Sequence, residues 1–181
     1  MLAIYIPQSA EGFELCHPVR HEDFETLFAA LNGSSRWSTW QSPPMRLVSQ
    51  ERGRPLAESD CPWLGKHALV FRRPAIAALE PMLHEYGELL PLACPDADLA
   101  IYNVTRMIDA LDEEASSVIR FSNGRVMRIP RYAFMSELVR GVDIFKIPCL
   151  RVSPTFVSED FVKLWQKNGL RGLVFNQVWS A

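Results

Sequence analysis

The sequence has few features that would assign it to a catalytic or cofactor-binding class. It lacks the motifs Gly-x-x-x-x-Gly-Lys-Ser/Thr, Gly-x-Gly-x-x-Gly and Gly-x-Ser-x-Gly, so phosphate-loop, dinucleotide-binding and hydrolase-elbow assignments have no starting point. Its four cysteines include no Cys-x-x-Cys pair, which argues against a zinc ribbon and a redox motif. We therefore predict no cofactor, no metal and no catalytic residues.

Long apolar runs are also missing. Charged residues or prolines interrupt every apolar stretch before the length of about 18 residues that a membrane span needs. The first residues carry no basic segment, and Pro7, Gln8, Ser9 and Glu11 interrupt them before a signal-peptide core could form. We expect a mature chain that starts here, a cytoplasmic location and no membrane contact. The four cysteines are enough for two disulfides, but reduced thiols are expected in that compartment.

Lysine is scarce, with four residues against 15 arginines, and neither residue forms a dense run. The formal net charge of −2 and the 48% hydrophobic content of the 181 residues are ordinary for a globular protein, so no nucleic-acid partner is predicted. A chain of this length can bury a substantial core as one domain over residues 1–181. Within it we distinguish an N-terminal segment, residues 1–86, with a long tryptophan- and proline-bearing loop at 33–65, from a C-terminal segment, residues 87–181.

Three helices are predicted from spacing and capping. Apolar residues from Phe24 to Leu31 recur at helical intervals, which predicts an amphipathic helix over 22–31 that ends at Asn32-Gly33. Pro74 suits the first turn of a second helix, which Pro81 should shorten or kink. Ser158 as N-cap and a glycine at 169 frame a third helix over 158–168. A single helical turn is expected over 109–114.

Strands outnumber the helices and do not alternate regularly with them. The clearest signal is a β-hairpin around Asn123-Gly124, a pair that suits a two-residue type I′ turn. The first strand is expected to lie at a sheet edge because Pro7 closes it. The pattern predicts an α+β fold, a largely antiparallel sheet with about three helices packed on it. The expected strands cover 2–6, 45–48, 68–71, 88–94, 99–104, 118–121, 125–129, 143–147 and 173–178.

Several residue groups have types that suit chemistry but spacings that favour a structural role. Cys16, His17 and His21 are close in sequence, yet Pro18 lies between the histidines and no second ligand pair is present, so a polar lead-in to the first helix is favoured. Asp96 and Asp98 follow Pro95, where aspartates commonly stabilise a turn. An enzyme acting on a small molecule remains the alternative, with a pocket near Cys94 and Asp96 that His67 or His84 would complete.

Two surfaces are candidates for binding a protein partner. Tryptophan is enriched among the residues that dominate interface energies, and functional residues favour loops, so the loop tryptophans are candidate contacts. Burial beneath the loop is the competing interpretation. An acidic cluster can steer a basic partner, while a solvated turn is the simpler explanation. The candidate contact residues are Trp37, Trp40, Trp63, Asp109, Asp112, Glu113 and Glu114.

From Gly87 onward, the order of several short motifs resembles immunity-protein family eleven of bacterial polymorphic toxin systems, formerly a domain of unknown function. The resemblance covers roughly the C-terminal half, and the quoted positions are mostly turn and core residues in collinear order. The motifs are Gly87-Glu-Leu-Leu-Pro-Leu-Ala-Cys94 with Pro95, Tyr102-Asn-Val-Thr105, Asp109-Ala-Leu-Asp112 with Ser116, Arg120-Phe121 to Gly124, Ile144-Phe145-Lys-Ile-Pro148, Val152 with Phe161, and Asn168-Gly169-Leu170-Arg-Gly172-Leu173-Val-Phe175.

This resemblance implies a small cytoplasmic protein that binds and neutralises a cognate toxin, protecting the producing cell and its kin, and that is not an enzyme. It carries no catalytic residue to this chain. The sequence leaves the toxin's activity, the mode of inhibition and the choice between a monomer and a homodimer open.

Overall fold

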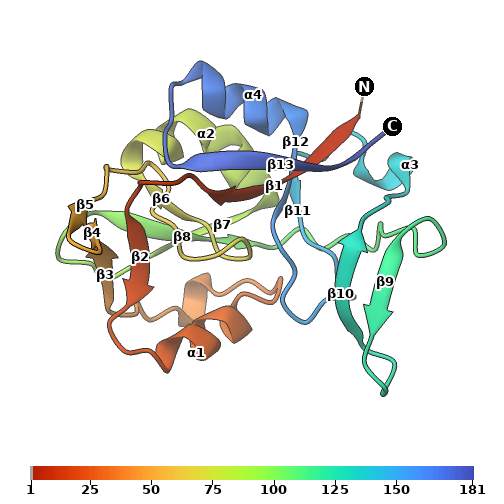
Figure 1. Cartoon of the computed structure of the whole chain (residues 1–181), viewed down its shortest axis with the longest axis horizontal. Coiled ribbons are helices and arrows are strands. Elements are labelled where there is room, and N and C mark those ends of the chain that lie inside the picture. Colours follow the sequence, from red (N-terminus) through yellow and green to blue (C-terminus); the bar gives the residue numbers. More distant parts are fainter. Residues whose placement is uncertain (1) are drawn as a thin grey trace.

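The computed structural model describes residues 2–181 (Figure 1). All its paired strands are antiparallel, and three of the four α-helices in the described residues have seven residues or more, which confirms the predicted α+β class. The helical segments are α1 (Asp23–Ala30), a 3-10 turn η1 (Trp37–Thr39), α2 (Arg73–Tyr86), α3 (Ser136–Val139) and α4 (Glu159–Lys167). The strands are β1 (Ala3–Ser9), β2 (Leu15–Pro18), β3 (Met45–Val48), β4 (Gln50–Glu51), β5 (Arg54–Pro55), β6 (Val70–Arg72), β7 (Gly87–Pro91), β8 (Leu99–Val104), β9 (Ser117–Arg120), β10 (Val126–Arg131), β11 (Ile144–Phe145), β12 (Phe156–Ser158) and β13 (Leu173–Ser180).

The largest sheet joins the two ends of the described chain, in the order β11-β12-β1-β13. Strand β1 is an inner strand, so the expectation that it lies at an edge is wrong. It also continues through Pro7 to Ser9 instead of ending at the proline. Within β1, only Ile4 and Tyr5 pair with β12, whereas Pro7 pairs with Phe175 of β13 alone. Proline is therefore tolerated because the strand has a partner on one side only at that point.

A second sheet, in the order β6-β8-β7, separates two hydrophobic cores. Side chains alternate across it: Phe71 and Tyr102 belong to the core that contains α2 and α4, and Val70 and Ile101 belong to the core under α1. Figure 1 shows α2 and α1 on opposite sides of this sheet. Since β6 comes from the N-terminal segment and β7 and β8 from the C-terminal segment, the two segments share one sheet.

The predicted helices are confirmed with small changes of boundary. Ser158 Oγ accepts a hydrogen bond from Phe161 N at 3.1 Å, which caps α4, and Phe161, Val162 and Trp165 are buried. Helix α2 is not shortened by Pro81, because it runs on to Tyr86. Pro81 is exposed, and its missing N–H removes one hydrogen bond without ending the helix.

Two local predictions need correction. The single helical turn expected over 109–114 lies further along the chain: residues 109–112 are not helical, and one i→i+4 hydrogen bond, from Ser116 N to Asp112 O at 3.0 Å, closes a turn over 113–115. Asp112 Oδ1 caps this turn by accepting a hydrogen bond from Ala115 N at 3.0 Å. The β9-β10 hairpin is present, but its loop has three residues, because Phe121 N donates to Arg125 O and Gly124 N to Phe121 O. Gly124 has φ +82° and Asn123 has a negative φ, which fits a type I turn with a glycine bulge and excludes type I′.

The stretch 33–65 contains more structure than the expected loop with one strand. Strand β3 is present as predicted, and β4 and β5 add a second hairpin with Arg52-Gly53 at its turn. Both turn residues have positive φ, at +49° and +75°, so the type I′ geometry occurs here. No helix among residues 2–181 is both long and apolar enough to cross a membrane.

Candidate partner-binding surface

The segment before Trp37 is hydrogen-bonded to the β6-β8-β7 sheet through two side chains that face each other. Glu88 on β7 and Asn103 on β8 are register partners, and Asn103 Nδ2 donates to Glu88 Oε1 at 2.8 Å and to Ser34 O at 2.9 Å. Glu88 also accepts hydrogen bonds from Arg36 N and Ser35 Oγ. Burial opposes ionisation of Glu88, but these donors outweigh it and lower its pKa below the usual value. The carboxylate is therefore held charged as the anchor of the segment.

The Trp37 side chain is exposed to solvent, and hydrogen bonds hold the residues on either side of it. On one side, the Arg36 guanidinium donates from Nε to Ala30 O at 2.8 Å. On the other side, Trp40 Nε1 donates to Pro91 O at 2.7 Å. Trp37 lies in η1 and its side chain is 66% exposed, more than any other large hydrophobic residue in residues 2–181. A large apolar ring is thus displayed on a segment that does not need to order itself on binding.

The other two candidate tryptophans have different surroundings. Trp40 is half-buried against the core under α1 and borders a groove of about 380 Å³ between α1 and residues 40–44. Trp63 is half-buried against the larger core, and its backbone lies between Glu14 and Cys16, with Cys16 N donating to Trp63 O at 2.9 Å. The structure does not bring the three rings together, and only Trp37 is presented to solvent.

The acidic residues line one turn beside the β9-β10 hairpin. Glu113 forms an ion pair with Arg120, and Asp112 is half-buried and caps the turn. Asp109 and Glu114 are exposed, and neither takes part in an ion pair among residues 2–181. Two of the four carboxylates are therefore engaged in holding local structure, and two face solvent.

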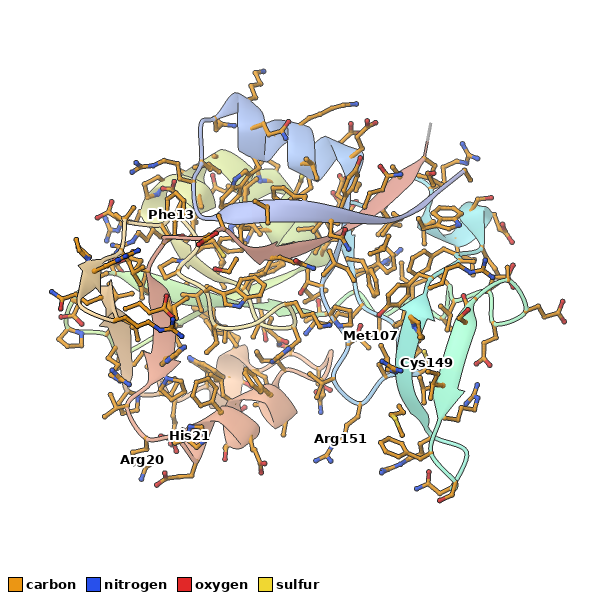
Figure 2. The ribbon with its side chains drawn as sticks, viewed as in Figure 1. Phe13, Arg20, His21, Met107, Cys149 and Arg151 are labelled. Atoms are coloured by element: carbon orange, nitrogen blue, oxygen red, sulfur yellow. The ribbon has the colours of Figure 1, made fainter. Side chains whose placement is uncertain are left out.

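A series of contacts connects the Trp37 segment to this turn. Gly33 has φ +92°, and a β-carbon there would clash with the side chain of Met107. Met107 bridges to Lys146, and Ile108 N donates to Lys146 O at 2.9 Å. Cys149 is close enough to the acidic turn for its charges to act on it: burial is the main cause that raises the pKa of the Cys149 thiol, and the charges of Glu113 and Asp109 raise it further. Figure 2 shows Met107 and Cys149 beside the β9-β10 hairpin.

The residues that the sequence suggested for metal binding or catalysis make structural contacts instead. Burial raises the pKa of the Cys16 thiol to about 12, so it is a poor metal ligand near neutral pH. His17 and His21 both contact the edge of Phe24. Asp98 forms an ion pair with the Arg73 guanidinium at 2.6 Å. Among residues 2–181 no group of three or more His, Cys, Asp or Glu side chains has the geometry of a metal site.

The residues of the alternative enzyme site do not line the larger hollows of the surface. Cys94, Asp96 and His84 line none of five hollows of about 320 to 560 Å³ on residues 2–181. His84 is exposed on α2, where its Nε2 is 3.8 Å from Glu80 Oε1. Asp96 is also exposed, and its Oδ2 lies 3.5 Å from Leu47 N.

The buried side chain of Lys146 lies between backbone carbonyl groups from two segments of the chain. Lys146 is 3% exposed, and its Nζ donates to His67 O at 2.7 Å and lies 3.5 Å from Leu31 O. Burial lowers the pKa of Lys146 to about 8 and, with help from the Lys146 charge, lowers that of His67 to about 4. His67 is therefore neutral at pH 7 and packs edge-on against Phe28, with ring centroids 3.9 Å apart.

Lys146 should make stability depend on pH in the alkaline range. Its pKa is near 8 in the folded state and 10.5 as an ordinary side chain, so between these values only the unfolded chain holds the proton. The free energy of unfolding should then rise with pH, by up to about 3 kcal/mol from this group. We expect the stability difference between the wild type and Lys146→Met, measured by urea unfolding, to shift by this amount from pH 8 to 10.5. A constant difference would contradict the assignment.

Sequence reasoning missed the groups that fix the candidate surface. Glu88 and Asn103 were visible only as members of strands, and no spacing rule links them to residues 34–36. Their pairing depends on the register of β7 and β8, which one sequence does not give. A polar residue inside an apolar strand, such as the fully buried Asn103, is the one available signal, because buried amides need partners.

Comparison with known proteins gives the chain its family. No curated protein matches it. Residues 92–180, about half of the chain, match the family described as the immunity protein family (Imm11). The matched region runs from the end of β7 to the end of β13 and contains the acidic turn and the β9-β10 hairpin, whereas Trp37 lies outside it. Through residues 92–180, the chain belongs to the Imm11 immunity protein family.

Proposed function

We propose that this protein neutralises a cognate bacterial toxin by binding it in the cytoplasm of the producing cell, and that it does so without catalysis. Family membership supports a toxin as the partner. The observation that carries the proposal is Trp37, an indole exposed to 66% on a segment that Glu88, Asn103 and Trp40 hold in place. Such a side chain loses little entropy on binding and gains much by burial.

The proposed contact surface is centred on Trp37 and extends to the acidic turn. Asp109 and Glu114 are the carboxylates available to a partner, while Asp112 and Glu113 keep the turn and the neighbouring hairpin in position. Trp40 and Trp63 belong to the proposed surface as supports of the loop and the core behind it. An inhibitor must cover a toxin's active site or lock an inactive state, which takes an interface of about 1,600 Å² in total.

The first experiment is co-expression. The C-terminal domain of the toxin encoded beside this protein is induced in a heterologous host, with and without the immunity candidate. Survival of the host together with co-purification of the two proteins would support neutralisation by direct binding. Continued killing, with the toxin active and this protein present in its folded form, would contradict the proposal.

Replacing Trp37 with alanine should weaken toxin binding strongly and leave the fold intact. Loss of a central aromatic anchor typically costs at least about 2 kcal/mol of binding free energy, close to a 30-fold rise in Kd. Because the ring is exposed, the free energy of unfolding should change by less than about 0.5 kcal/mol. Calorimetric titration and thermal melting measure the two quantities. Val174→Ala removes another exposed apolar side chain and serves as the control. Equal affinities for both variants would remove Trp37 from the surface.

The acidic turn should contribute through long-range attraction. Asp109→Lys combined with Glu114→Lys spares the capping and paired carboxylates, so it changes charge without removing a described contact. We expect slower association with the toxin and a weaker dependence of the association rate on salt, both read by stopped-flow fluorescence. Glu51→Lys combined with Glu58→Lys makes the same charge change at exposed positions elsewhere. Indistinguishable rates for the two double variants would exclude electrostatic steering by this turn.

A further inference from the structure

The β9-β10 hairpin carries an unusual concentration of one charge. Residues 117–132 contain Arg120, Arg125, Arg128 and Arg131 and no acidic residue or lysine, in a chain with a formal net charge of −2. The hairpin forms a two-stranded sheet of its own, and Figure 1 shows it standing out from the rest of the molecule. A positive arm therefore projects from a protein that is acidic as a whole.

One side of the hairpin is used by the fold, which leaves the other side for a partner. Val118, Val126 and Ile129 pack against the larger core. Phe121 and Met127, each 46% exposed, remain in solvent. In the sequence, Phe121 and Met127 lie on either side of Arg125. The Arg125 guanidinium carbon is 6.0 Å from the centre of the Phe121 ring. Apolar and cationic groups are thus presented together.

The hairpin is braced against the acidic turn before any partner arrives. Arg120 pairs with Glu113, and Arg131 Nη2 donates to Ala115 O at 3.1 Å. Ala133 N donates to Ser116 Oγ at 2.9 Å, immediately after the hairpin. Arg120 and Arg131 therefore hold the arm in place. Arg125 and Arg128 take part in no ion pair among residues 2–181, so their guanidinium groups are available. A preformed arm loses little entropy on docking.

The composition of this surface selects the chemistry of its partner. Arginine, phenylalanine, methionine and tyrosine are enriched at protein–protein interfaces, whereas lysine, aspartate and glutamate are depleted. Arginine binds carboxylates through two parallel hydrogen bonds, so an acidic protein surface suits the arm. A nucleic acid suits it less, because the turn with Asp109, Asp112, Glu113 and Glu114 lies next to the hairpin and repels a phosphate backbone.

We propose that Arg125 and Arg128, together with Phe121 and Met127, dock on a carboxylate-rich surface of the cognate toxin. This inference rests on the proposed function and adds the chemistry of the contact. The adjoining acidic turn then requires the toxin to present basic groups beside its acidic patch. A pattern of both signs rejects partners with a uniform charge, which gives an immunity protein selectivity for its own toxin.

The test compares two hairpins of the same chain. Arg125→Glu with Arg128→Glu reverses the charge of the arm, and Arg52→Glu with Arg54→Glu makes the same change in the exposed β4-β5 hairpin. Kd for the purified toxin domain is measured at low and high salt, alongside survival in co-expression. We expect the arm variant to bind at least about tenfold more weakly than the wild type with a reduced salt dependence, and the control to stay within about threefold. Circular dichroism and thermal melting verify that both variants fold.

A second arm variant, Arg125→Ala with Arg128→Ala, removes charge without adding a repulsive group and should show an intermediate loss of affinity. If the wild type binds and protects while both arm variants match the control, the arm is not a contact and the proposed function still stands. If the wild type itself neither binds the toxin nor protects, the proposed function and the inference fall together. Tighter binding of the wild type to a DNA duplex than to the toxin, lost in the arm variants, would also overturn the inference.

Discussion

Trp165→Ala should lower the free energy of unfolding by about 3–5 kcal/mol, the range measured when a large core aromatic is truncated. Trp165 is 2% exposed on α4 and contacts the edge of Phe175 on β13, with ring centroids 6.0 Å apart. Its removal leaves a cavity between the helix and the main sheet, because Ser158 and Gly169 fix the ends of α4 and limit collapse.

Urea unfolding followed by fluorescence and circular dichroism measures the effect of this substitution. Gln166→Ala is the matched control, since Gln166 is the next residue of the same helix and is exposed. The control should stay within about 0.5 kcal/mol of the wild type. A loss under about 1 kcal/mol for Trp165→Ala would mean that this face of α4 is not buried.

Glu14→Ala should be strongly destabilising, by about 3 kcal/mol, because it leaves a mostly buried guanidinium without its charged partner. Glu14 is 6% exposed, and its Oε1 accepts hydrogen bonds from Arg72 Nη2 at 2.6 Å, Arg72 Nε at 3.1 Å and Ser59 N at 3.1 Å. One carboxylate oxygen therefore satisfies donors from two other segments. Arg72 Nε keeps a second acceptor, Ser59 O at 3.0 Å, but alanine leaves Arg72 Nη2 and Ser59 N without the Glu14 oxygen.

A double-mutant cycle separates the pair from its surroundings. Glu14→Leu with Arg72→Met removes both charges at similar volume and should recover most of the stability lost in Glu14→Ala. The neighbouring pair of Arg73 and Asp98 has a similar separation of 2.6 Å but is largely exposed, so Arg73→Ala should cost less than about 1 kcal/mol. Equal losses from the buried and the exposed pair would contradict the role of burial.

Much of the fold could be predicted because its signals are local. The apolar spacing from Phe24 to Leu31 and the cap at Ser158 depend on neighbours within one or two helical turns, and both helices are confirmed. The position of β1 could not be predicted, because its partners β12 and β13 lie near the other end of the sequence. A proline marks where pairing on one side stops, and it does not say which side or which strand is the partner.

Turn geometry was predicted wrongly where the sequence looked typical, and it was not predicted where the sequence was unusual. Asn123-Gly124 suits a type I′ turn, but the hairpin closes one residue further out and leaves only Gly124 with positive φ. The type I′ turn occurs at Arg52-Gly53 instead, where arginine is an uncommon first residue. Pairing register, which is a property of both strands, decides between such alternatives.

The candidate surface was predictable only piece by piece. The sequence singled out Trp37 and the acidic residues of 109–114 by type and position in loops. The sequence contained no sign that Glu88 and Asn103 hold the segment before Trp37 in place. It also did not indicate that Glu113 pairs with an arginine of the following hairpin. Side chains that meet across strands are separated by sequence distances that follow no rule, so their joint effect emerges only in three dimensions.

The inner position of β1 also determines when the molecule can be assembled. Residues 3–9 are synthesised early, but their hydrogen-bonding partners lie at 157–158 and 173–180, so the main sheet closes only after almost the whole chain is available. Contacts of such high sequence separation make folding slow, and the exposed strand needs protection until then. Under the proposed function, protection would depend on a stock of finished molecules, because a chain still on the ribosome has no complete sheet with which to present the proposed binding surface.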